Sequence, residues 1–278
     1  MTVFILKIIA MVTMLCDHLA SAFFDGNAVM RSIGRTAFPI YAFLIAEGFY
    51  HIKNRSTADE KLAGGYGSNG TSLDKGISGI AISSKVKKHF TRLLLLTLIS
   101  EIPYDLMEEG KFFAWNSQSV MLTLLVGMAG LLIVEYFRNF PVFIVVFYVV
   151  AALAMYLARP NYYVAGIFMI LFYYWYANNC REWPVWKKYL ILTAFSLVYL
   201  PLYNWIRYGF PGLEELVTRT LKGWSWLVPY IWINLLFATY NGKNGYKNKT
   251  LNMCYALFYP VHLLIIAIIE FAIGKFTL

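Results

Sequence analysis

The sequence predicts an all-α membrane protein, a bundle of about nine transmembrane helices. Of its 278 residues, 59% are hydrophobic and only 14% are charged, and the mean hydropathy of +0.57 lies outside the range of soluble domains. The apolar residues form runs that match the bilayer core, which takes about 20 residues of helix. The formal charge of +9 comes from basic residues between these runs. That pattern favours orientation in a membrane and argues against nucleic acid as a partner.

The spans follow the apolar runs in chain order. The first run could alternatively be a secretory signal, because Lys7 precedes its apolar part and small residues follow. An Asp-His pair inside that run and the further apolar sequence downstream favour a retained span. We expect spans at about 4–24, 36–52, 90–107, 119–137, 141–158, 161–177, 189–206, 224–240 and 251–273.

The basic residues predict the orientation of these spans. The connections at 53–92, 138, 181–188 and 243–249 carry 15 lysines and arginines, and the opposite set carries 8. The positive-inside rule therefore places the N-terminus in the cytoplasm and the C-terminus outside. We expect a single domain over 1–278 in a bacterial inner or cytoplasmic membrane, in contact with lipid.

One connection is long and hydrophilic. The stretch at 53–88 contains several glycines between residues 64 and 70 and predicts a flexible cytoplasmic loop. Its glycines lack the Gly-Lys-Ser/Thr ending of a phosphate-binding loop. A nucleotide role for this loop is therefore not favoured.

Asp17 and His18 lie side by side inside the first span. An Asp at the centre of a transmembrane helix costs roughly 2.5 to 3.5 kcal/mol on translocon scales, so such groups usually line a cavity or pathway. Lys7 and His18 are 11 residues apart. At 100° per residue this brings them within about 20° on one helix face, and about 16 Å apart along the axis. Both side chains can therefore face the same cavity.

Later spans carry further ionisable residues. Glu47 and His51 are four residues apart and share a face of the second span, so they can interact. Glu101 and Asp105 are one turn apart in the third span, with Pro103 between them. A proline at this depth is tolerated best beside a polar cavity.

The last span contains His262, next to a proline-containing turn. A lone buried histidine is usually a hydrogen-bonded structural residue. Several ionisable groups fall at the same middle to outer depth, however, which favours one shared polar pocket. We expect this pocket to contain Asp17, His18, Glu101, Asp105 and His262.

A histidine with a carboxylate beside it suits general base chemistry, because its reference pKa of about 6.5 lets it take up and release a proton near neutral pH. Neighbouring helical residues diverge by about 100°, so Asp17 need not serve His18. Glu47, Glu101 and Asp105 remain alternatives. Metal binding is not expected, because no spacing such as His-Glu-x-x-His occurs in the sequence.

Basic residues mark the predicted cytoplasmic entrance of the third span. Lys88 and Arg92 are four residues apart and share a helix face. Cations there would suit the phosphates of a cytosolic cofactor. The positive-inside rule alone also predicts basic residues at the cytoplasmic end of a span. We favour this topological explanation for Lys88, and for Arg92 both phosphate binding and topology remain open.

The order of these motifs resembles the TraX family. The resemblance rests on Leu6 to Met11 with Asp17 and His18, on Gly-Arg-Thr-Ala-Phe-Pro at 34–39 with Glu47-Gly48-Phe49, on Arg92-Leu93-Leu94 with residues 100–105, and on residues 258–263. It spans nearly the whole chain. The family's namesake is a conjugal transfer protein associated with N-terminal acetylation of F pilin.

The family is similar in turn to a wider group of membrane acyltransferases, which includes enzymes that O-acetylate cell-surface glycans and lysosomal heparan N-acetyltransferase. The resemblance implies that His18 is the catalytic base or acyl acceptor and that acetyl-CoA is the acyl donor. It also implies that Arg92 helps to hold the coenzyme A, together with Lys88, Lys7 and Arg35. Lys7 stands where arginine is more usual, and an ammonium lacks the bidentate fork of a guanidinium.

These observations favour an integral membrane acetyltransferase. It would draw acetyl-CoA from the cytoplasm and acetylate an amine or hydroxyl of a peptide, pilin or glycan reached from the outer side. The alternative is a proton-coupled transporter that uses the same buried ionisable residues as a relay. The transporter would explain the buried charges but not the order of the motifs.

Overall fold

The computed structural model describes the chain except for residues 64–83, 223–226, 247 and 276–278. The described residues form only helices and connections, which confirms the all-α prediction. The helices are α1 (Val3–Phe23), α2 (Ala28–Gly34), α3 (Ala37–Ala63), α4 (Ser84–Glu109), α5 (Val120–Tyr136), α6 (Pro141–Ala158), α7 (Tyr163–Asn179), α8 (Val185–Arg207), α9 (Leu213–Lys222), α10 (Leu227–Ala238) and α11 (Lys249–Ala272).

Four of the described helices are long and apolar enough to cross a membrane. These are α1, α6, α8 and the Thr250–Ala272 part of α11. The helices α5 and α10 are apolar but shorter. The structure therefore describes a membrane protein by the length and composition of its helices.

Each predicted span corresponds to one helix, with ends that differ by a few residues for most of them. The main difference is at the predicted loop 53–88: α3 continues to Ala63 and α4 begins at Ser84, so both ends of that stretch are helical. The glycines between 64 and 70 lie outside the described residues. Two short helices, α2 and α9, fall in connections where no helix was predicted.

The helix α2 forms because the turn before it supplies both a bend and a cap. Gly26 adopts a positive φ of 69°, and the side chain of Asn27 accepts hydrogen bonds from the backbone N–H groups of Val29 and Met30. These bonds satisfy donors that the first turn of a helix otherwise leaves unpaired. The short helix brings the chain back against the end of α1.

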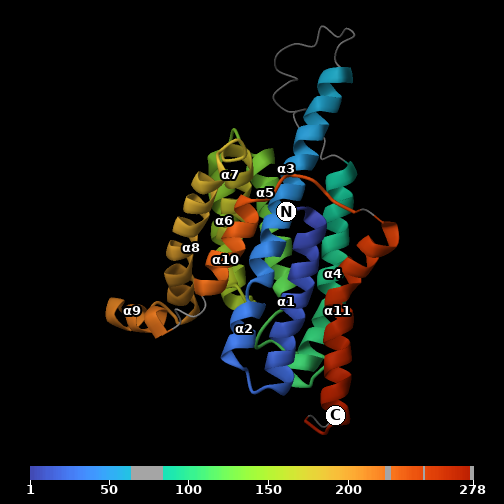
Figure 1. Ribbon diagram of the computed structural model, residues 1–278, viewed down its shortest axis with the longest axis vertical. Coiled ribbons are helices and arrows are strands. Elements are labelled where there is room, and N and C mark those ends of the chain that lie inside the picture. Colours follow the sequence, from blue (N-terminus) through green and yellow to red (C-terminus); the bar gives the residue numbers. More distant parts are fainter. Residues whose placement is uncertain (64–83, 223–226, 247, 276–278) are drawn as a thin grey trace.

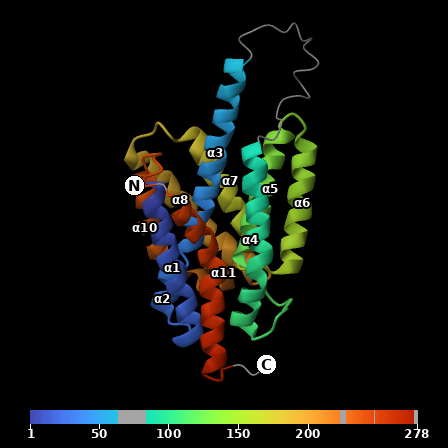
Figure 2. The same ribbon diagram turned by 90° about the vertical axis from the view of Figure 1, so that its right-hand side faces the viewer.

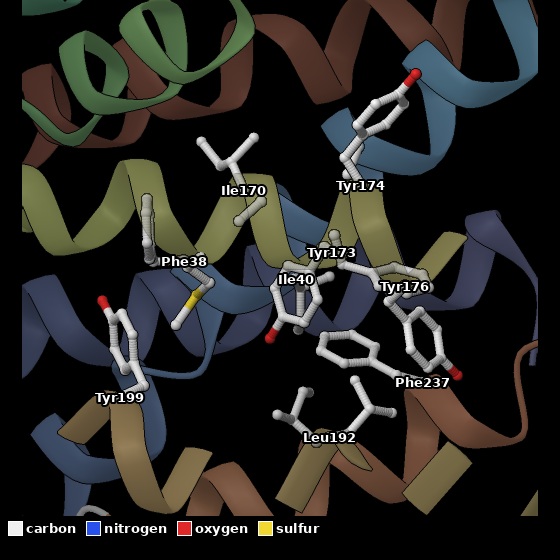
Figure 3. Packing of buried hydrophobic residues seen from close by; sticks show 14 of the residues in the cluster. Phe38, Ile40, Ile170, Tyr173, Tyr174, Tyr176, Leu192, Tyr199 and Phe237 are labelled. Carbon is white, nitrogen blue, oxygen red and sulfur yellow. The ribbon is translucent and has the colours of Figure 1, made fainter. Parts of the chain in front are cut away.

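The helices pack into a bundle around two apolar clusters. In one part, α1, α4 and α11 lie side by side (Figures 1 and 2), around buried residues that include Met14, Tyr104 and Tyr259. In the other part, α3 packs against α7, and α8 against α10. Aromatic rings fill that second cluster, where Tyr173 and Phe237 lie edge to face (Figure 3). Phe43 stacks on Phe237 at 4.4 Å between ring centroids and also lies edge to face with Tyr173.

The helix α6 lies at the periphery of the bundle (Figure 2), and one of its faces consists of exposed apolar residues. An exposed face of this size is unfavourable in water, whereas lipid tails cover it without cost. Its exposed residues include Val142, Phe143, Val145, Val146, Val149, Val150, Leu153 and Leu157.

A close contact at Gly34 fixes α2 against α1. A Cβ atom added to Gly34 would overlap the Cβ atom of Asp17 and approach its Cα to 2.6 Å. Real Cβ atoms do not approach other atoms so closely, so glycine is required at this position. The contact locks the end of α2 to the residue that precedes His18.

We expect Gly34→Ala to destabilise the protein by about 1 to 3 kcal/mol, the usual range for overpacking. The measurement is thermal unfolding of the purified protein in detergent. Gly48→Ala is the matched control, because nothing lies within 4 Å of a Cβ atom there. An equal melting temperature for Gly34→Ala and wild type would contradict the requirement for glycine at position 34.

Candidate functional site

Two histidines from opposite ends of the sequence meet between α1 and α11. The ring centroids of His18 and His262 are 5.1 Å apart, and the two rings are tilted by 52°. The side chains are nearly closed off from solvent, with exposed fractions of 7% for His18 and 5% for His262. The ring centroids of Tyr259 and His18 are 6.1 Å apart, in an edge-to-face arrangement. Burial of two imidazoles side by side is unusual for packing alone and marks a candidate site.

The hydrogen bonding of His262 fixes its tautomer. Its Nδ1 lies 2.6 Å from the carbonyl oxygen of Phe258, so Nδ1 carries a hydrogen and donates. The remaining nitrogen, Nε2, is buried and accepts no hydrogen bond from any described residue. The Phe258 ring stacks on His262 at 4.7 Å and holds its plane.

His18 has a similar unused atom. Its Nδ1 is buried without a hydrogen-bond partner in the described part of the chain. Buried polar atoms are normally hydrogen bonded, so each exception needs an explanation. A pair of unpartnered imidazole nitrogens is what a site would keep for a ligand or a transferred proton.

Asp17 pairs with an arginine that sequence reasoning missed. Arg31, in α2, places its Nη1 atom 3.2 Å from Asp17 Oδ1 and also donates to the Asp17 carbonyl oxygen at 3.4 Å. The sequence gives no signal for this pair, because it depends on how α2 folds back on α1. Asp17 therefore neutralises a cation beside His18.

Arg35 is buried between α2 and α3, at the same end of the bundle as His18. Its guanidinium carbon lies 5.8 Å from the Tyr162 ring centroid, and the Tyr162 hydroxyl donates to the Arg35 carbonyl oxygen at 3.5 Å. Burial works against the charged form, but Tyr162, Tyr203 and Asp17 hold the pKa of Arg35 above its ordinary value. We call this part of the molecule the histidine end, defined by His18, His262, Asp17, Arg31 and Arg35.

Glu101 and Asp105 do not join the two histidines. Glu101 Oε1 accepts a hydrogen bond from the Ser119 N–H at 3.0 Å, at the start of α5. Asp105 Oδ2 accepts one from the Ala114 N–H at 2.9 Å. The two carboxylates hold the connection between α4 and α5. The expectation of one pocket shared by all five residues is therefore only partly met: His18 and His262 meet, and Glu101 and Asp105 have backbone partners.

Glu47 lies elsewhere again. It is buried, and its Oε1 is 3.1 Å from His51 Nε2, which confirms the predicted interaction of these two residues. Its second partner, Arg181, donates from Nη1 at 3.0 Å and was not predicted. Glu47 and Arg181 line a cavity of about 240 Å³ at the other end of the bundle. Its other lining residues include Phe43, Tyr176, Phe237 and Tyr240.

Three of the four predicted cofactor-binding residues lie together. Lys7 Nζ is 3.5 Å from Asn252 Oδ1, and Arg92 Nη2 donates to the Asn252 carbonyl oxygen at 3.0 Å. Burial, followed by the charges of Arg92, Lys7 and Lys88, lowers the pKa of the neighbouring His89. We call this the basic end, defined by Lys7, Lys88, Arg92 and Asn252. Arg35, the fourth predicted residue, lies at the histidine end instead.

The contacts along α1 and α11 join these two ends. Lys7 contacts Asn252 and lies over the Tyr255 ring at 5.2 Å, and His18 contacts His262. Because later residues of α1 meet later residues of α11, the two helices run parallel. Lys7 and His18 thus both face α11, about 16 Å apart along the axis.

A further buried carboxylate, Glu270, closes the histidine end. It is fully buried and accepts a hydrogen bond from Lys275 Nζ at 2.5 Å. Lys275 also donates to the Ala22 carbonyl oxygen at 3.1 Å, which ties the ends of α1 and α11 together. The sequence held a signal for Glu270, a carboxylate within an apolar run.

Comparison with known proteins decides the family. The sequence matches the family described as TraX protein over residues 3–270. The chain belongs to the TraX family. A relative from Dichelobacter nodosus, a probable fimbrial assembly protein FimC of serogroup H1, is 24% identical over 271 residues, which cover 94% of this chain and 92% of the relative. No solved structure matches the chain.

The roles of the carboxylates in this TraX protein can be tested at Glu101. We expect Glu101→Ala to destabilise the fold by about 1 to 2 kcal/mol, because the Ser119 N–H loses its acceptor at the start of α5. Thermal unfolding in detergent measures the change. Glu109→Ala is the control, since the bond that Glu109 accepts from the Asn116 side chain is exposed to solvent. Lost turnover with an unchanged melting temperature would instead place Glu101 in the chemistry.

Proposed function

We propose that this TraX protein is an integral membrane acetyltransferase, with acetyl-CoA as its acyl-donor substrate and an amine or hydroxyl as its acceptor. One observation carries the proposal: His18 and His262 form a buried pair, and one nitrogen of each ring has no hydrogen-bond partner among the described residues. Acyl transfer needs a base that removes a proton from the attacking group, and imidazole serves this role near neutral pH.

The proposal includes a topology. The nine helices α1, α3 to α8, α10 and α11 would cross the membrane, and α2 and α9 would lie at its surface. The N-terminus and the basic end would face the cytoplasm, as the distribution of lysines and arginines favours. The histidine end would then lie toward the opposite side, where the acceptor arrives.

The basic end suits the phosphates of the acyl donor. Arg92 is exposed, and Lys7 and Lys88 add positive charge beside it. Charge-assisted hydrogen bonds from such groups bind phosphate oxygens strongly. The distance of about 16 Å from Lys7 to His18 along α1 is one that the extended pantetheine arm of coenzyme A spans.

At the histidine end, His18 would take the proton of the acceptor as its nitrogen or oxygen attacks the acetyl carbonyl carbon. His262 would stand beside it, with its orientation fixed by the bond to Phe258 and its Nε2 available as a second proton acceptor. The Asp17–Arg31 pair would keep the negative charge of Asp17 from fixing a proton on His18 permanently.

The relative favours one class of acceptor. It is named as a probable fimbrial assembly protein, and the family's namesake is associated with acetylation of pilin. We therefore propose a pilin-type subunit, or a peptide amine like its N-terminus, as the acceptor. Such a subunit would reach the histidine end from the outer side.

We expect His18→Ala to abolish release of coenzyme A from acetyl-CoA, with a loss of at least about 100-fold, because a positioned general base contributes 10² to 10⁴. Binding of acetyl-CoA should persist, since the phosphate-binding residues are untouched. Purified protein in detergent serves for both measurements. His51→Ala is the matched control, because His51 lies at the Glu47 cavity.

Two results would contradict this assignment. Wild-type turnover by His18→Ala would remove the histidine pair from the chemistry. A wild-type protein that neither binds nor turns over acetyl-CoA would favour the proton-coupled transporter, for which the buried ionisable residues would be the relay.

We expect Arg92→Ala to raise the KM for acetyl-CoA about tenfold or more with little change in kcat, because a phosphate contact remote from the reacting carbonyl contributes to substrate binding. Steady-state kinetics over a range of acetyl-CoA concentrations measure both constants. Lys187→Ala is the control, since Lys187 lies over the exposed Trp186 ring. A fall in kcat alone would place Arg92 outside the donor site.

A further inference from the structure

Arg35 is held next to the residues that precede the catalytic histidine. Gly34 packs directly on the Cα and Cβ atoms of Asp17, so the backbone at Arg35 has a fixed position relative to His18. Arg35 itself is 7% exposed. A buried cation is costly unless other groups compensate it, so its place beside the histidine pair requires a reason.

The surroundings of Arg35 keep its charge at the histidine end. Its guanidinium lies 5.8 Å from the centroid of the Tyr162 ring, and Asp17, the residue before His18, is among the groups that hold the pKa of Arg35 above its ordinary value. The neighbouring Arg31 is less buried and forms the ion pair with Asp17. The two arginines are therefore not equivalent, because Arg31 neutralises a carboxylate that belongs to α1.

We propose that the Arg35 guanidinium stabilises the negative charge that develops on the acetyl carbonyl oxygen during acyl transfer. The inference rests on the proposed acetyltransferase function and adds a catalytic group to it. It also replaces the expectation that Arg35 binds coenzyme A phosphates, because Arg35 lies at the histidine end and Lys7 and Arg92 lie at the basic end.

The charges in this reaction balance around Arg35 and His18. The acceptor lone pair forms a bond to the carbonyl carbon, and the carbonyl π electrons move onto the oxygen. The Arg35 guanidinium stabilises the negative charge on that oxygen. His18 takes the acceptor proton. When the oxygen re-forms its double bond, the carbon–sulfur bond breaks, and the sulfur leaves with that electron pair and receives the proton from His18.

Arginine suits this position better than lysine would. A guanidinium carries five N–H donors in a fixed plane, so it can keep its contacts with the Tyr162 region and still direct a donor at an oxygen. A group held in place before the reaction stabilises developing charge without reorganisation. Removing one such donor in other enzymes lowers kcat about 100- to 1,000-fold.

The test compares Arg35→Ala with wild type for release of coenzyme A, for acetyl-CoA binding and for rescue by guanidinium ion. We expect kcat to fall about 100- to 1,000-fold, acetyl-CoA affinity to stay within about twofold, and added guanidinium to restore part of the rate. Arg181→Ala is the matched control, since Arg181 donates to Glu47 Oε1 at 3.0 Å, away from the histidine end. Added guanidinium should not raise the rate of coenzyme A release by this control variant.

The second variant, Arg35→Gln, removes the charge but keeps a polar side chain. It tests the role of the Arg35 charge if Arg35→Ala does not fold. Full kcat in Arg35→Gln overturns the proposal. So does a raised KM with unchanged kcat, which would make Arg35 a donor-binding residue. If wild type shows no His18-dependent release, the acetyltransferase function itself fails, whereas normal wild-type release with an active Arg35→Gln overturns Arg35 alone.

Discussion

The parallel packing of α1 on α11 is the interaction on which the site depends. The two helices lie more than 200 residues apart in the sequence, and their contact places His18 beside His262 and Lys7 beside Asn252. An ion pair between Lys275 and Glu270, together with the bond from Lys275 to Ala22, closes one end of this interface. The histidine pair and the contact of Lys7 with Asn252 thus lie on one pair of helices, while α2 adds Arg31 to the histidine end and α4 adds Lys88 and Arg92 to the basic end.

The ionisable groups of the apolar part have specific partners. Glu101 and Asp105 accept hydrogen bonds from the backbone between α4 and α5, and Glu47 binds Arg181 and His51. In a low-dielectric interior an unpaired carboxylate costs several kcal/mol, so each pairing fixes a connection or a helix. One nitrogen of each paired histidine, Nδ1 of His18 and Nε2 of His262, is buried with no hydrogen-bond partner among the described residues, and so are single oxygens of Asp105 and Glu270.

The sequence predicted the helices well because length and hydropathy determine them. The apolar run at 141–158 coincides with α6, and the shared face of Lys7 and His18 follows from helical geometry alone. The sequence could not predict the pairing of Asp17 with Arg31 or the backbone partners of Glu101 and Asp105. Those contacts depend on short connections that fold back on the bundle, and the hydropathy of the sequence does not predict how such connections fold. The histidine pair was predicted in part. The sequence placed His18 and His262 at a similar depth in their spans, but their contact depends on the packing of α1 against α11.

The parallel arrangement of α1 and α11 also constrains the biogenesis of the protein. The ribosome delivers α1 first, and the partner that completes the histidine end emerges only after the remaining helices have been synthesised. Until α11 inserts, His18 has no imidazole neighbour and the buried face of α1 must be covered by lipid or by a chaperone. A chain that stalls before α11 therefore carries only half of the histidine pair, and the pair forms only at the last step of assembly.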